Sequence, residues 1–227
     1  DIKPNRLVRA QRKLQDLLTL RKEGVTALIA YAGDAHTVSP LTDDANTISE
    51  MIPAVTPEIM PAPGSQLAPA LNLAVQLFTD AGVASGRILL LTDEIRDIAE
   101  SQAIAREHRT AYPISVMSVG TAAGAPIDGS RLLRDGGYLK DFQGNLVIPR
   151  VNLSAMQDFA QVAGGRYSPM TLTDEDLDYL LADEALSPTT DFREQERDFD
   201  VWFEEGPWLV LLLLPLAALA FRRGWLW

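Results

Sequence analysis

The sequence contains no cysteine and only two histidines, which removes several kinds of metal and catalytic chemistry. Without cysteine there are no disulfides, no thiolate metal sites and no cysteine nucleophiles. His36 falls in an expected loop and His108 on the charged face of an expected helix, so both are predicted to be ordinary surface residues. The chain also lacks the GxxxxGK[ST] and GxGxxG motifs, so the sequence offers no phosphate-binding loop for a nucleotide.

Positive charge is scarce, because the 227 residues carry a formal net charge of -11. Such a charge repels a nucleic-acid backbone unless the basic residues gather on one surface. Seven basic residues near the start of the chain fall on one expected amphipathic helix: Lys3, Arg6, Arg9, Arg12, Lys13, Arg21 and Lys22. A cluster of this kind is usually a solvated helix face, so we predict no nucleic-acid binding.

The apolar pattern switches repeatedly between helical and extended periods. Helices are predicted at residues 5–22, 43–54, 66–81, 98–111, 154–163 and 174–185, and strands at residues 25–33, 87–93, 113–120 and 166–170. Two short apolar arms around Gln143, Gly144 and Asn145 predict a hairpin. Alternating strands and helices predict an α/β fold with a doubly wound, mostly parallel sheet and helices on both faces. Because this series opens on a helix, we expect a further strand upstream of Asp1.

The end of the chain differs in kind from the rest. An apolar run at residues 208–221 lies between Trp202 and Trp208 on one side and Trp225 and Trp227 on the other, with Arg222 and Arg223 after it. The run is shorter than the roughly 20 residues that cross a bilayer, which favours a buried helix, but the flanking tryptophans resemble interfacial belts.

From these flanks we predict an α/β domain at residues 1–186, an acidic linker at residues 187–206 and a transmembrane helix at residues 207–224. Short basic flanks stay in the cytoplasm, which would place the domain in the periplasm of a bacterium, anchored in the inner membrane.

Two oxygen-bearing side chains stand out at expected strand and helix ends. Asp93 directly follows the apolar strand ILLLT, and Ser65 follows Gly64 just before a helix. Each has an ordinary explanation as a helix cap. Both also belong to the carboxyl edge of a parallel sheet, where open α/β folds bind their ligands, and hydroxyl and carboxylate oxygens suit Mg2+.

Several blocks carry a resemblance to a known family. They are PLTDD at residues 40–44, PGSQLAPAL at 63–71, LLLTDE at 89–94, VGTAAGAPI at 119–127, YLKDFQGNLV at 138–147 and AGGRY at 163–167. In this order they resemble von Willebrand factor A (VWA) domains, and more narrowly the membrane-anchored, BatB-like members of the bacterial aerotolerance-operon (Bat) group.

The resemblance implies a metal-ion-dependent adhesion site (MIDAS) that binds Mg2+ or Mn2+. The family's threonine corresponds to Ser65 and its aspartate to Asp93, while its DxSxS motif would lie upstream of this chain. The glycine that usually follows the aspartate is replaced by Glu94. Thr42 is expected near the same edge, as a structural residue first and a metal ligand second.

By the same resemblance, the protein is expected to be an interaction or scaffolding module and not an enzyme. Implied partners are sibling Bat proteins, tetratricopeptide-bearing proteins and a MoxR-type ATPase. One alternative is a small metal-dependent hydrolase or phosphoryl-transfer enzyme that uses Asp93 and Glu94, although no nucleophile is paired with a base in the sequence. A second alternative is a metal-free VWA scaffold, which the extra charge of Glu94 favours.

Overall fold

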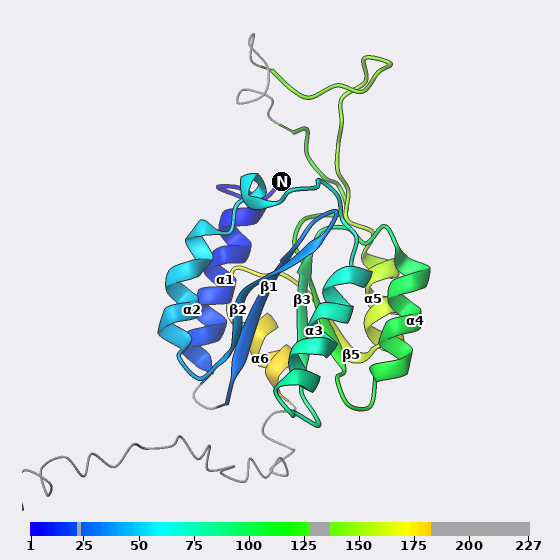
Figure 1. Cartoon of the computed structure of the whole chain (residues 1–227). Helices are drawn as coiled ribbons and strands as arrows, with labels where there is room; N and C mark the ends of the chain where they lie inside the picture. The colour runs from blue at the N-terminus through cyan, green and yellow to red at the C-terminus, as the bar shows by residue number, and fades with distance from the viewer. Residues whose placement is uncertain (22–23, 128–136, 183–227) are drawn as a thin grey trace, which may run out of the picture. The chain divides into compact units, whose positions relative to one another are not determined.

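A parallel three-stranded sheet forms the centre of the computed structural model, which describes residues 1–21, 24–127 and 137–182 (Figure 1). The strands lie in the order β3 (Ile88–Thr92), β4 (Ile114–Ser118) and β5 (Gly164–Pro169). Each overlaps a strand predicted from the sequence. Because the strands are parallel, all three end at one edge of the sheet, which we call the carboxyl edge.

A separate two-stranded antiparallel sheet consists of β1 (Thr26–Tyr31) and β2 (Ala35–Thr42). β1 was predicted, whereas β2 was not. The segment AHTVSPLT is half-exposed, contains Pro40 and is paired on only one side within the described chain, so its apolar residues are too few to predict a strand. His36 therefore lies in a strand opposite Ala30, and the expectation that it lies in a loop was wrong.

β1 and β3 are not joined by a strand ladder in the part of the chain that the structure describes. Their ends are linked instead by side chains, since the Tyr31 hydroxyl lies 2.6 Å from Thr92 Oγ1. Both residues are the last of their strands, so β1 and β3 end at the same edge. The further strand predicted upstream of Asp1 stays a prediction, and these two unpaired edges are where a parallel strand would find partners on both sides.

Helices cover both faces of the parallel sheet, as predicted. On one face, α3 (Ala68–Asp80), α4 (Ile98–His108) and α5 (Leu153–Val162) pack against β3 and β4 (Figure 1). This core contains Leu71, Val116 and the fully buried ring of Phe159. The alternation of strand side chains sends Leu90 and Val116 to this face and Leu89, Leu91 and Met117 to the other.

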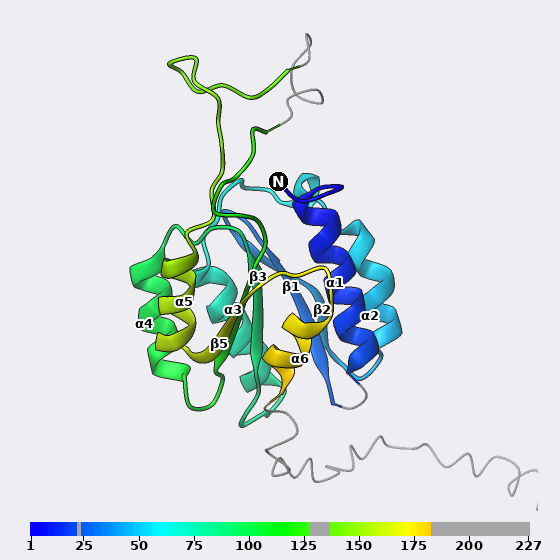
Figure 2. The same cartoon turned by 180° about the vertical axis from the view of Figure 1, so that it is seen from behind.

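The opposite face carries α1 (Arg6–Leu20) and α6 (Glu175–Leu181), which Figure 2 shows from behind. Asn5 caps α1 by accepting a hydrogen bond of 2.8 Å from the Val8 amide. Beside α1 lies α2 (Ala45–Met51), followed by 3-10 turns at Ile52–Ala54 and Pro57–Ile59. Leu18, Ile48 and Ile52 form a small core between α1 and α2.

The basic face of α1 is not wholly solvated, which corrects the sequence expectation. Lys13 is 5% exposed, and its Nζ lies 2.7 Å from Asp176 Oδ1 at the start of α6. The same ammonium donates to the Thr173 carbonyl. Asp176 also accepts a hydrogen bond of 2.8 Å from the Thr171 amide, so a buried and fully bonded ion pair ties α1 to α6.

A long excursion between β4 and α5 leaves the domain at the carboxyl edge (Figures 1 and 2). We call its described residues, 121–127 and 137–150, the arm. The hairpin predicted around Gly144 is present as one antiparallel bridge, Lys140 opposite Leu146, with a bond from the Gly144 amide to the Asp141 carbonyl. Ile127 joins it by bonds to Leu139 and Val147.

The predicted anchor at residues 207–224 and the linker at residues 187–206 lie outside the described residues. Within the described ranges, no helix is both long and apolar enough to cross a membrane. The domain boundaries therefore stay predictions.

Candidate binding edge

Two loops bring Ser65 and Asp93 to the carboxyl edge of the sheet. Asp93 directly follows β3, and Ser65 lies in the loop before α3. The loops are joined by a backbone hydrogen bond of 3.2 Å from the Arg96 amide to the Ser65 carbonyl. The structure thus places both predicted residues on neighbouring loops at the expected edge.

Neither residue acts as the helix cap that its sequence context suggests. The amide of Leu67, just before α3, and that of Ala68, its first residue, donate to the carboxylate of Asp97 at 2.8 and 2.7 Å. Asp97, in the loop between β3 and α4, therefore caps α3, and Ser65 does not cap it. This cap was not predicted, because Asp97 directly precedes α4 and its sequence context points to that helix.

The carboxylate of Asp93 pairs with a guanidinium instead. Arg6 Nη1 lies 3.0 Å from Asp93 Oδ2, and the two residues are 87 positions apart in the sequence. Arg6 also donates to the carboxylate of Asp1 and, at 2.9 Å, to the Pro149 carbonyl at the base of the arm. Sequence analysis missed this role, because Arg6 was assigned to a solvated helix face.

Glu94 turns to a different partner at the same edge. Its Oε2 lies 3.0 Å from Arg96 Nε, and both side chains are more than half exposed. Deeper in the edge, burial raises the pKa of Tyr31, so its hydroxyl stays neutral beside Thr92. Thr92 Oγ1 is within 2.8 Å of the Glu94 carbonyl, which fixes the turn after β3.

Thr42 lies away from this edge, so its expected placement was wrong. It pairs with Thr26, the first residue of β1, because β2 runs antiparallel to β1. The Thr42 hydroxyl accepts a hydrogen bond of 3.1 Å from the Asp44 amide, at the turn into α2. Thr42 is thus structural, and it lies at the opposite end of β1 from Tyr31.

The two histidines lie away from Asp93 in ordinary surroundings. His36 Nε2 is 3.8 Å from Asp34 Oδ2, and both side chains are exposed. His108 lies in the last turn of α4, with its ring 6.3 Å from that of Tyr112.

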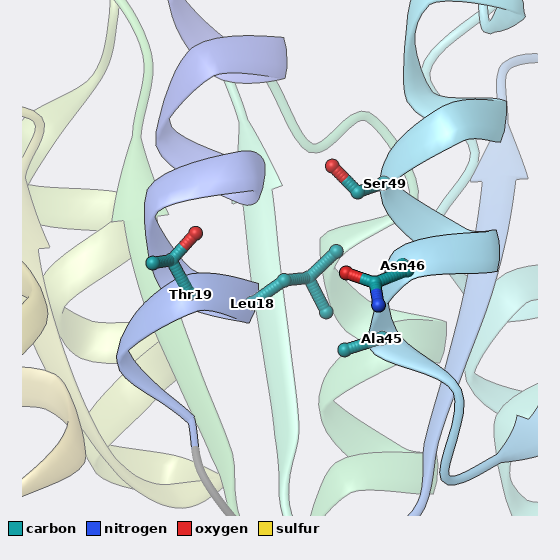
Figure 3. A pocket seen from close by; sticks show the side chains of 5 residues that line it. All are labelled: Leu18, Thr19, Ala45, Asn46 and Ser49. Carbon is teal, nitrogen blue, oxygen red and sulfur yellow. The ribbon is translucent and has the colours of Figure 1, made fainter.

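A pocket of about 280 Å³ lies between α1 and α2, lined by Leu18, Thr19, Ala45, Asn46 and Ser49 (Figure 3). Twelve helical positions separate Leu18 from Arg6, or about 18 Å along α1. The pocket therefore does not belong to the carboxyl edge. None of these five lining residues carries a charge.

Comparison with known proteins identifies the domain. Residues 1–95, which include Ser65 and Asp93, match the family of von Willebrand factor type A domains. Residues 1–95 therefore belong to a VWA domain. A search of curated proteins finds no match.

Two solved Bacteroides structures resemble the chain over most of its length. An aerotolerance-related membrane protein from Bacteroides fragilis is 25% identical, with a TM-score of 0.72, and the match covers 82% of this chain and 90% of that one. BatB from Bacteroides thetaiotaomicron is 28% identical, with a TM-score of 0.66, over 82% of this chain and 87% of that one. These matches support a BatB-like VWA protein, as the sequence blocks predicted.

A more distant VWA structure shares the fold alone. Proximal thread matrix protein 1 from the mussel byssus, solved with a zinc-occupied MIDAS motif, is 16% identical with a TM-score of 0.51. The match covers 79% of this chain and 40% of that one. That protein binds its metal at a MIDAS motif, which raises the question of whether this VWA domain holds the same ligand set.

The described residues of this VWA domain do not make a metal site by themselves. No group of three or more acidic or histidine side chains that could hold a metal ion is present among them. Asp93, which the sequence resemblance matches to the family's aspartate, already accepts at Oδ2 from the positively charged Arg6. Mg2+ demands near-octahedral oxygen coordination, so the hydroxyl of Ser65 and a shared carboxylate are too few ligands.

Proposed function

We propose that this protein is a membrane-anchored VWA module of the bacterial envelope that recruits or scaffolds other proteins through its carboxyl edge. One observation carries the proposal. The arm rises from the carboxyl edge, where Ser65 and Asp93 also lie (Figure 1). It exposes four large apolar side chains: Tyr138, Phe142, Leu146 and Ile148. Exposed apolar groups gathered on one element mark interaction surfaces in soluble domains.

The arm has the properties of a binding element. Phe142 is 112% exposed relative to its reference state, so nothing in the described chain covers its ring. The turn that carries Phe142 is held by the Asp141 carboxylate, which accepts from the amides of Gln143 and Asn145 at 2.9 Å. A fixed turn with an uncovered aromatic ring loses little conformational entropy on binding, which favours affinity.

The partners that we propose are those of the Bat resemblance: sibling Bat proteins, tetratricopeptide-bearing proteins and a MoxR-type ATPase. The inner-membrane anchor is part of the same proposal, and the description of the Bacteroides fragilis relative as a membrane protein supports it. An anchored periplasmic domain would face envelope partners, while the ATPase would act from the cytoplasmic side.

The hydrolase or phosphoryl-transfer alternative has less support. It requires Asp93 and Glu94 to act as metal ligands or as an acid and a base, and the two carboxylates pair with Arg6 and Arg96 respectively. We therefore propose a function without catalysis.

Mg2+ or Mn2+ dependence of recruitment, expected from the resemblance, requires ligands beyond Ser65 and Asp93. The ion pair between Asp93 and Arg6 instead favours the metal-free scaffold as the second candidate.

Partner capture tests the arm. A photo-crosslinking residue placed next to Phe142 in the full-length membrane protein is expected to give discrete protein adducts. Phe142→Gln is expected to weaken the affinity for the captured partner about 30-fold, which corresponds to loss of an aromatic hot spot of about 2 kcal/mol. Leu20→Gln is the matched control, because Leu20 is also an exposed apolar residue but lies at the far end of α1. Equal affinity of the Phe142→Gln and wild-type proteins would remove the arm from the proposal.

Membrane fractionation tests the anchor. The full chain is expected to stay in the membrane fraction after an alkaline wash, and a chain ending near residue 205 is expected to be released, because the apolar run at residues 208–221 is then missing. A reporter fused after residue 227 should behave as cytoplasmic. Recovery of the full chain in the soluble fraction would contradict the anchor.

A further inference from the structure

We propose that the guanidinium of Arg6, and not a metal ion, is the counter-charge of the Asp93 carboxylate. Through its other hydrogen bonds, Arg6 also holds the base of the arm against the sheet. The relevant residues, which we call the Arg6 cluster, are Arg6, Asp1, Asp93, Thr121 and Pro149. The inference rests on the proposed function only in treating the arm as the partner-binding element. It adds that the carboxyl edge recognises its partner without a bound metal ion.

The guanidinium of Arg6 is nearly saturated with acceptors. Nε donates to Asp1 Oδ1 at 3.0 Å, and Nη2 donates to the other oxygen of the same carboxylate. Nη2 also donates to the Pro149 carbonyl at 2.9 Å, and Nη1 donates to Asp93 Oδ2 at 3.0 Å. Four of the five N–H donors of a guanidinium are therefore engaged.

These contacts reach both ends of the arm. Pro149 belongs to its returning segment, and Thr121 begins its outgoing segment. Asp1 Oδ2 connects Thr121 to the cluster, since it accepts from the Thr121 amide at 3.0 Å and lies 3.2 Å from the Thr121 hydroxyl. The Thr121 carbonyl in turn accepts from the Val151 amide at 3.2 Å, so the two segments are also bonded to each other.

The backbone beside the cluster is shaped for close contact with the guanidinium. Gly120 has a φ of +135°, and a Cβ atom added there would lie 2.8 Å from Arg6 Cζ. A side chain at this position would push the guanidinium away. The glycine thus lets Arg6 lie against the chain where the arm begins.

Arg6 compensates the charge of Asp93, which is what a metal ion does for the aspartate of a MIDAS. A forked guanidinium bonded to two carboxylates is a strong, charge-assisted arrangement, and its side chain is only 18% exposed. A divalent ion at Asp93 would have to displace this donor or lie beside a like charge. Arg6 has no open coordination position for a partner's carboxylate, so we infer that the partner is recognised by apolar contact with the arm.

Hydrogen exchange and thermal unfolding of the full chain in detergent test this assignment. Arg6→Met is expected to speed amide exchange at residues 119–124 and 148–151 about tenfold, because those segments lose their shared bonds. Exchange at the Gly144 amide should not change, because its acceptor Asp141 lies within the turn. Arg12→Met is the matched control, since Arg12 is exposed on the same helix.

Magnesium provides the second measurement. The wild-type chain is expected to unfold at the same temperature, within about 1 °C, in millimolar MgCl2 and in EDTA, because a ligand raises stability only where it binds the folded state. A magnesium-dependent rise that Asp93→Asn abolishes would show that a metal ion is the cation of Asp93, and would overturn the proposal. Unchanged exchange at the arm base in Arg6→Met would overturn it as well.

Two further variants keep the outcomes separate. If Arg6→Met fails to fold, Arg6→Lys keeps the charge near Asp93 but loses the fork to Asp1 and Pro149, and it should still speed exchange at the arm base. Phe142→Gln should leave that exchange unchanged. Partner affinity and amide exchange at the arm base are thus measured independently. The proposed function and the role of Arg6 can therefore be disproved separately.

Discussion

Replacing Lys13 with methionine is expected to lower the free energy of unfolding by about 3 kcal/mol, the low end of the range for breaking a buried ion pair. The side chains of Lys13 and Asp176 are 6% and 0% exposed, so the substitution would leave a carboxylate buried without its counter-charge. The ammonium also bonds the Thr173 carbonyl, which would lose its donor. Urea unfolding should be followed by far-UV circular dichroism, because all four tryptophans lie beyond residue 200.

A second substitution tests whether the lost stability comes from the unpaired charge of Asp176. In Lys13→Met combined with Asp176→Asn, the amide oxygen can still accept from the Thr171 amide, but no uncompensated charge is buried. Most of the lost stability should return, to within about 1 kcal/mol of the wild type. Arg12→Met, on the exposed side of the same helix, should have little effect. Equal stability of Lys13→Met and the wild type would show that the pair does not hold α1 to α6.

Gly165→Ala is the second large effect, expected at about 3 kcal/mol from overpacking. Gly165 lies in an irregular stretch of the β4–β5 pairing, where one extra residue of β5 is accommodated between the Ile114 and Val116 positions. A Cβ atom there would lie 2.0 Å from the Ile114 carbonyl oxygen and 2.6 Å from the Ser115 nitrogen. These are backbone atoms, so no rotamer change can relieve the clash and the two strands must separate.

The same substitution at Gly82 provides the control for Gly165→Ala. Gly82 has a φ of +68°, but an added Cβ would meet nothing within 4 Å. Gly82→Ala should therefore cost roughly 1 kcal/mol, from the left-handed backbone alone. Thermal or urea unfolding compares the two variants. If both cost the same, the close approach of β4 and β5 contributes nothing beyond glycine conformation.

Local patterns were sufficient to predict most of the α/β elements. The apolar spacing of α1 is contained in a few consecutive turns of the sequence, and the buried runs of β3 and β4 are each contained in five residues. The carboxyl-edge position of Asp93 followed from the general rule that parallel strands end together. β2 was not predicted because this half-exposed strand contains Pro40 and shows no strong alternation of apolar and polar residues. Thr42 was misplaced for the same reason.

The contacts that define the site could not be predicted from spacing. Arg6 is 87 positions from Asp93, and Lys13 is 163 positions from Asp176. Helical periodicity places both basic residues on a charged face, but only the tertiary packing of α1 against the sheet decides which of them are buried. Asp97 presents the same problem, since its local context indicates α4 while its carboxylate bonds the amides of α3.

The unpaired edges of β1 and β3 bear on how cooperatively the domain folds. The β1–β2 sheet packs with α1 and α2, and the β3–β4–β5 sheet has its own ladder, so within the described chain no backbone ladder spans the two. Side chains such as Ile29 and Tyr31 provide the link. Structures of this kind can open in sub-global units. A strand paired with both edges would join the two sheets by backbone hydrogen bonds. The two units would then unfold together, and the pairing of that one strand would set the free energy of unfolding of both.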